Sequence, residues 1–247
     1  MADTPDQLLE RWVIAQSGDT VPWVRDQLAL LSQSTKERDL HIFLGLAPRR
    51  LGKADLDLSA KDLQDADIVL PGWRPDGWSI DGAARVLGLL WFKGARPFAE
   101  IFKDLRRTSD AAEMIALYRG LPLYPEPESM DFEVGEGLRS NLKPVFEAIA
   151  HRNPFARDVF DQHRWNHMIL KALFVEVDLA PITGLKDRAN PELARILIDF
   201  AKERWAAGRP LAKEHWISVA PFRHDPTIEA ELDRAIAEGR LTEGELQ

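Results

Sequence analysis

The sequence predicts an all-α fold, and three observations support this. Apolar residues recur at intervals of three and four along most of the chain, as in helices with one buried face. No segment alternates apolar and polar residues with β-branched enrichment, and no Asn-Gly or Asp-Gly turn joins two such segments. Prolines and glycines separate the periodic segments. We expect about a dozen short helices in antiparallel pairs, with a HEAT- or armadillo-like geometry, although no fixed sequence period is present.

Nine helices are predicted before residue 153 from apolar periodicity and from start and stop signals. In chain order they cover residues 8–16, 20–31, 36–46, a short segment after Ser59, and residues 78–92, 96–107, 109–119, 130–140 and 142–152. Pro22 favours the start of the second helix, because a missing N–H is harmless in a first turn. Residues 48–58 break the helical period and are expected to be extended. The helix at 78–92 is apolar on nearly all sides, which predicts a central position.

Two further helices and an ordered loop are predicted between residues 164 and 209. The first helix has an apolar face at helical spacing, made of Trp165, Met168, Ile169, Ala172 and Leu173. The second begins at Asn190, a favoured N-cap residue, followed by Pro191. Its apolar face consists of Leu193, Ile196, Leu197, Phe200 and Ala201. Arg195 has the spacing to pair with Glu192 and Asp199. Residues 178–190 form the ordered loop between the two helices.

Composition limits the classes of function that the chain can have. The 247 residues are 45% hydrophobic, which suffices for a full core, and we expect one all-α domain over residues 1–247. A formal net charge of −8 argues against nucleic-acid partners and anionic membranes. The absence of cysteine excludes disulfides, thiolate metal sites and cysteine nucleophiles. Without a signal peptide or an apolar run that spans a bilayer, the protein is expected to be cytoplasmic.

One charged residue stands out within the central helix. Arg85 is the only charge in residues 82–92, and a buried arginine without a partner would cost several kcal/mol. Asp81, one turn earlier, has the spacing to pair with it. A carboxylate or phosphate on a ligand is the alternative partner.

The C-terminal block contains three further candidates for ligand binding. Asn166 and Lys171 lie off the apolar face of a strongly packing helix, where they either bond to neighbouring helix ends or contact a ligand. Asp187, Arg188 and Asn190 belong either to a helix-cap network or to the rim of a site. His163 and His167 have a metal-ligand spacing, but the chain shows no obvious third histidine, so no metal is expected. His163 and Asp81 remain weak candidates for an acid or a base.

Catalytic and cofactor signatures are missing. The sequence has no P-loop and no Gly-x-Ser-x-Gly elbow, and Gly135-Glu-Gly137 lacks the strand that precedes a dinucleotide loop. No cofactor is therefore expected, and enzymatic activity stays an open question.

The segment WNHMILKALF, followed by GLKDRANPELARILIDFAKERWAAGR, resembles the C-terminal signature of the EboA family of bacterial proteins. WSIDGAARVLGLL, LYRGLPLYP and Asn153-Pro154 are similar to that family too. His167 stands where the family motif has glutamine. The resemblance implies a cytoplasmic protein from a gene cluster for a secondary metabolite, expected to be a prenylated polar compound. Candidate partners are the biosynthetic enzymes of that cluster and an anionic or polar small molecule.

Three hypotheses follow for the function. In the first, the protein is a helical accessory protein that binds a pathway enzyme or an intermediate. In the second, it is an enzyme acting on a polar or phosphorylated cyclitol- or sugar-like metabolite. Arg85, Lys171 and Arg188 would then hold the anion, and Asp81 or His163 would be the acid or base. In the third, the eight tryptophans indicate a self-assembling structural protein.

Overall fold

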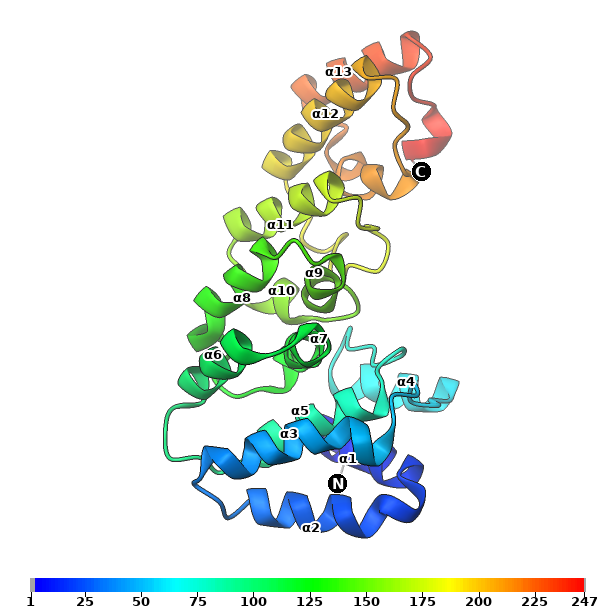
Figure 1. Cartoon of the computed structure of the whole chain (residues 1–247). Helices are drawn as coiled ribbons and strands as arrows, with labels where there is room; N and C mark the ends of the chain where they lie inside the picture. Colours follow the sequence, from blue (N-terminus) through cyan, green and yellow to red (C-terminus); the bar gives the residue numbers. More distant parts are fainter. Residues whose placement is uncertain (1–2, 247) are drawn as a thin grey trace. The chain divides into compact units, whose positions relative to one another are not determined.

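The computed structural model describes residues 3–246, and the all-α prediction is confirmed (Figure 1). Within these residues there is no β-strand, only an isolated antiparallel bridge between Asp55 and Ser79. None of the helices between residues 3 and 246 combines the length and apolar character needed to cross a bilayer. The expected HEAT- or armadillo-like stacking stays a prediction.

The chain divides into two compact units, one up to Phe155 and one from Ala156 onward. The first unit contains α1 (Pro5–Gln16), α2 (Val21–Leu31), α3 (Glu37–Leu51), α4 (Ala60–Val69), α5 (Ile80–Trp91), α6 (Phe98–Thr108), α7 (Ala111–Arg119), α8 (Asp131–Arg139) and α9 (Lys143–Ala150). The boundary falls in α10 (Phe155–Val159). The second unit contains α11 (Gln162–Phe174), α12 (Pro191–Ala206) and α13 (Pro226–Ala237). Short 3₁₀ turns complete the chain, namely η1 (Gly18–Thr20), η2 (Leu121–Leu123), η3 (Pro127–Met130), η4 (Lys213–Ser218), η5 (Ala220–Phe222) and η6 (Glu243–Leu246). The expected single domain stays a prediction.

Helix α5 is the centre of the first unit, as its apolar sequence predicts (Figure 1). It packs against α1, α2, α3 and α7. Nine of its residues are buried, including Asp81 and Arg85. The exception is Trp91, which we expected on the buried face but which is 37% exposed at the end of the helix. At Gly88 the helix meets α3 so closely that a Cβ atom would lie 2.3 Å from the Phe43 ring.

Helix α3 corrects one prediction, because it continues to Leu51 instead of ending near residue 46. The proline at 48 therefore lies inside a helix, within a segment expected to be extended. Pro48 has no N–H to donate to the carbonyl of Leu44, four residues earlier. The Nε atom of Arg85 donates to that carbonyl instead, at 3.1 Å. A side chain from another helix thus satisfies the group that the proline leaves free, and the helix tolerates the proline.

Helix α12 organises the second unit and packs against α11, α13 and η4. It begins as predicted, since the Asn190 side chain accepts a hydrogen bond from the N–H of Leu193 at 2.9 Å. The ion pairs differ from those that the spacing indicated. Arg195 pairs with Asp225 at 2.9 Å, because the residue preceding α13 comes within reach of α12.

Candidate functional site

Arg85 and Asp81 form a buried ion pair in the first unit. Their charged atoms are 3.3 Å apart, and their side chains are 6% and 4% exposed. Arg85 also approaches Glu113 on α7 at 3.4 Å and bonds to the carbonyl of Leu44. The guanidinium is thus surrounded by two carboxylates and one carbonyl from its own protein. The sequence left two partners open for Arg85, namely Asp81 and an anionic ligand. The structure shows the pair with Asp81.

Asn166 joins the start of α12 to the middle of α11. It is 1% exposed, although helical spacing placed it off the apolar face. Its side-chain amide exchanges hydrogen bonds with that of Asn190, with N···O distances of 2.9 and 3.3 Å. It also donates to Glu192 at 3.3 Å. Asn190 is at the same time the N-cap of α12, so this amide pair fixes the end of the loop at residues 178–190.

Arg188 holds the same loop against the helices that precede it. Its guanidinium donates to the carbonyls of Arg157 and Phe160, at 2.5 and 2.9 Å. The cation lies 5.2 Å from the centre of the buried Trp165 ring, within the range of a cation–π interaction. Arg188 and Asn166 are therefore brought together as supports of one loop.

The remaining candidates lie on α11. Lys171 is half-buried, and its expected contact with a ligand stays a prediction. His163 and His167 are exposed, and their ring centres are 4.2 Å apart. Across residues 3–246, no three His, Asp or Glu side chains gather in a way that could hold a metal ion. Asp81 belongs to the first unit and His163 to the second.

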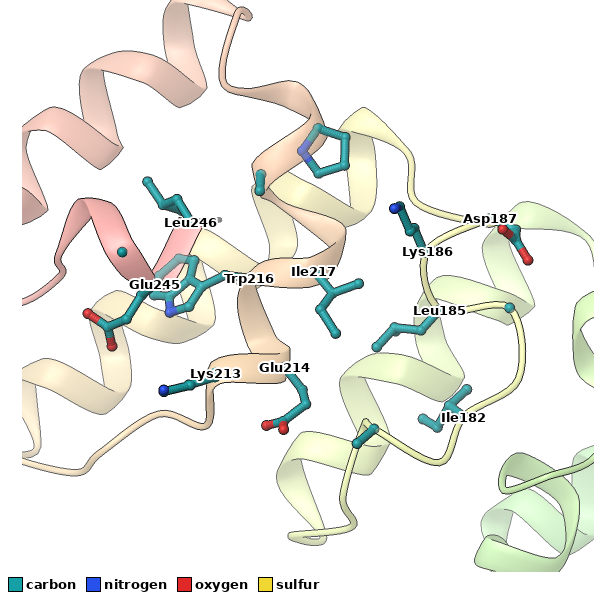
Figure 2. A pocket seen from close by; sticks show the side chains of 15 residues that line it. Ile182, Leu185, Lys186, Asp187, Lys213, Glu214, Trp216, Ile217, Glu245 and Leu246 are labelled. Carbon is teal, nitrogen blue, oxygen red and sulfur yellow. The ribbon is translucent and has the colours of Figure 1, made fainter. Parts of the chain in front are cut away.

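The second unit contains a pocket of about 640 Å³, which Asp187 lines and Arg85, Asn166, Lys171 and Arg188 do not (Figure 2). One wall is the loop at residues 178–190, and another is formed by η4 and η5. Ile182, Leu185 and Trp216 contribute buried apolar side chains. Ile217 is 37% exposed and points across the pocket towards Leu185, as Figure 2 shows. Its side chain presents apolar surface that the protein itself does not cover.

Charged side chains line the pocket beside this apolar surface. Lys186 and Asp187 lie on the loop, and Lys213 and Glu214 lie at the start of η4 (Figure 2). Within the described part of the chain, none of these four side chains makes an ion pair or a hydrogen bond. Each wall therefore carries one cation and one carboxylate that no other described side chain pairs.

Hydrogen bonds and ring stacking hold the two walls in place. Ser218 donates to the carbonyl of Leu185 at 3.0 Å and joins η4 to the loop. The Nε2 atom of His215 lies 2.8 Å from the carbonyl of Leu197, which joins η4 to α12. Trp216 stacks on Trp205, with ring centres 5.9 Å apart. Burial lowers the pKa of His215 to about 4, so this histidine is neutral at physiological pH.

A second structural constraint shapes the loop wall. Gly184 has a φ of +86°, and a Cβ atom there would lie 2.6 Å from the Arg157 side chain. Only glycine combines this backbone conformation with so close an approach. The loop is therefore fixed at Gly184 by this close approach and at Leu185 by the hydrogen bond from Ser218.

Sequence reasoning identified the loop but missed the pocket. It offered Asp187, Arg188 and Asn190 as the rim of a site, and of these Asp187 lines the pocket, beside Lys186. The sequence does not identify the segment from Lys213 to Ile217, because the segment is too short to show a helical period. The available signal was His215-Trp216-Ile217, a bulky run between Pro210 and Pro221.

Comparison with known proteins agrees with the family resemblance of the C-terminal motifs. A family profile described as "Metabolite traffic protein EboA" matches residues 5–220. The match covers all of the first unit that follows residue 4, and it extends through α11, α12 and η4. No curated protein and no solved structure gives a significant match. Because the profile covers most of its length, this chain belongs to the EboA family.

Proposed function

We propose that this protein is an accessory protein of metabolite traffic that binds a small metabolite in the pocket of its second unit. The observation that carries the proposal is the pocket itself. Its volume of about 640 Å³ lies in the range of small-molecule sites, roughly 300–1,000 Å³. The family description supplies the metabolite-related role.

The lining of the pocket supports an amphipathic ligand. Apolar surface at Leu185 and Ile217 would cover a hydrocarbon part, because burying it removes apolar area from water. The unpaired charges of Lys186 and Lys213 would meet a polar or anionic part. A prenylated polar compound, which the family resemblance implies, has both parts. We further propose that the protein passes this compound to or from an enzyme of its gene cluster.

The geometry favours this role over the enzymatic alternative. That alternative needs Arg85 to hold an anion, but the protein's own carboxylates surround the guanidinium of Arg85. It also needs Arg188, whose guanidinium is occupied by two backbone carbonyls and by the Trp165 ring. Both arginines act in the proposal as structural supports.

Binding is tested with farnesol and farnesyl diphosphate as probes, by titration calorimetry. We expect both to bind, and the diphosphate to bind more tightly because of the lysines. Ile217→Glu places a carboxylate in the apolar wall and should weaken binding of farnesol by roughly tenfold or more, the cost of one lost apolar contact with an added buried charge. Ile68→Glu is the matched control, since Ile68 is exposed on α4 in the other unit. Equal affinities for the two variants would disprove the assignment of the pocket.

A partner enzyme is tested separately. The cluster enzymes are mixed with the wild-type protein and with Ile217→Glu, and complexes are detected by analytical ultracentrifugation. A complex that forms equally with both proteins, together with no binding of either probe, would favour a protein-binding role without a ligand.

A further inference from the structure

The third wall of the pocket is the C-terminal turn, which we define as residues 243–246. Gly244, Glu245 and Leu246 line the pocket beside Trp216, and η6 packs against η4 (Figure 2). This turn lies beyond residue 220, where the match to the family profile stops. The two walls made by the loop and by η4 therefore belong to the matched segment, and the third wall does not.

One arginine ties the C-terminal turn to the pocket wall. Arg223 directly follows η5 and contacts both carboxylate oxygens of Glu243, with Nη2 to Oε1 at 2.8 Å. Arg223 is also 3.6 Å from Asp233 on α13. The arginine thereby connects three elements of the second unit. We call the bidentate contact between Arg223 and Glu243 the latch.

Besides its packing against η4, the turn is closed by hydrogen bonds to Glu245. The N–H and hydroxyl of Thr242 donate to Glu245 at 2.8 and 2.7 Å, which closes the turn locally. Leu241, just before it, is only 2% exposed and anchors the segment. Gly239 has a φ of +69° and ends α13 with open space around it.

The latch is weak enough to open without unfolding the protein. Its side chains are 37% and 57% exposed, so water and salt screen the attraction between them. Segments with few buried contacts and exposed ion pairs open locally at much lower free energy than the whole fold. The turn from 243 to 246 fits this description, since Leu241 is its only fully buried neighbour in the connection from α13.

We propose that the C-terminal turn is a hinged lid that controls access to the pocket, with the Arg223–Glu243 latch holding it closed. This inference rests on the proposed ligand site and adds how a ligand enters it. Leu246 and Glu245 then face the bound molecule and limit its size.

The absence of cysteine makes a direct test possible. Ile217→Cys introduces a single thiol in the pocket, and its rate of modification by a bulky maleimide reports access. Adding Glu243→Gln removes the latch charge and keeps the shape of the side chain. We expect modification to become roughly two- to fivefold faster, as the loss of one exposed ion pair implies. High salt should accelerate the modification of Ile217→Cys alone, but not that of the double variant with Glu243→Gln.

Two controls separate the lid from general loosening. Glu136→Gln removes an exposed partner of Arg139 on α8 in the other unit and should leave the rate at Ile217→Cys unchanged. A thiol at Ile68→Cys should react at the same rate with and without Glu243→Gln. Deletion of residues 241–247 should accelerate modification further than Glu243→Gln. Equal rates in the parent, the Glu243→Gln variant and the deletion would overturn the lid.

Ligand protection tests the proposed function apart from the lid. If farnesyl diphosphate slows modification of Ile217→Cys and Glu243→Gln raises the rate, both proposals hold. If the probe gives no protection while the latch still controls the rate, the gated pocket stands and the metabolite assignment fails. Protection by the probe without any effect of the latch leaves the ligand site and removes the lid.

Discussion

The buried arginine of the first unit compensates for a proline on a neighbouring helix. Pro48 removes one hydrogen bond from α3, and Arg85 supplies a donor for the carbonyl that is left, at 3.1 Å. Asp81 and Glu113 then balance the charge of Arg85. Leaving a buried carboxylate or carbonyl without its partner costs far more than an exposed ion pair contributes. Arg85 is thus explained by the packing of α3, α5 and α7.

Loss of Arg85 should therefore destabilise the protein strongly. We expect Arg85→Met to lower the free energy of unfolding by about 3–5 kcal/mol, because Asp81 would remain buried and unpaired. Urea denaturation measures the change. In the Pro48→Ala background the loss should shrink by about 1 kcal/mol, since α3 regains its own donor for Leu44. Arg96→Met, which removes ion pairs with Glu37, Glu100 and Asp104 at the surface, is the control and should change stability much less. If the two substitutions changed the free energy of unfolding additively, the link between Arg85 and Pro48 would be disproved.

His215 should make stability depend on pH. Its pKa in the fold is about 4, against 6.5 in the unfolded chain, because burial disfavours the charged ring. Between these values the unfolded chain binds a proton that the folded chain does not. Stability contributed by neutral His215 is complete above pH 6.5 and falls as the pH drops towards 4, by about 3 kcal/mol in total. Denaturant titrations between pH 5 and 7 should show this slope, and His215→Gln should flatten it.

At the scale of elements, the close approach of a helix or a loop to its neighbour depends on glycine. Gly88 lets α5 contact α3 at the Phe43 ring, and Gly184 lets the pocket loop approach Arg157. Helix α12 depends instead on Asn190, which caps it and pairs with Asn166. The N-cap was recognisable from the sequence, because capping is local. The partner of that cap was not, since it lies 24 residues away in α11.

Two glycine variants distinguish packing from helix propensity. Gly88→Ala should destabilise the protein by about 1–3 kcal/mol, because its Cβ would overlap the Phe43 ring. Gly45→Ala is the matched helical control, with nothing within 4 Å of the added Cβ atom. It should stabilise by about 0.5–1 kcal/mol through helix propensity alone. Thermal unfolding of the two variants gives the comparison, and shifts of the same sign would contradict it.

At the scale of the whole molecule, we predict one cooperative domain. The boundary between the two compact units lies within α10, not in a flexible linker of the kind that usually separates domains. We expect calorimetry to give a single transition whose van't Hoff and calorimetric enthalpies agree. Gly88→Ala in one unit and His215→Gln in the other should shift the same transition. Two resolved transitions, each moved by only one of the variants, would show two independent domains.

The sequence by itself determined the all-α class, most helix positions, the cap at Asn190, and the family resemblance. These depend on neighbours within one or two turns of helix, so local spacing carries them. Only the tertiary structure decided the partners of Arg85, the proline within α3 and the pocket beside Ile217. Glu113 and Leu44 lie far from Arg85 along the chain, and separate segments build the pocket, so these contacts leave no periodic signal. The candidate site therefore moved from the charged residues of single helices to a surface that three separate segments build together.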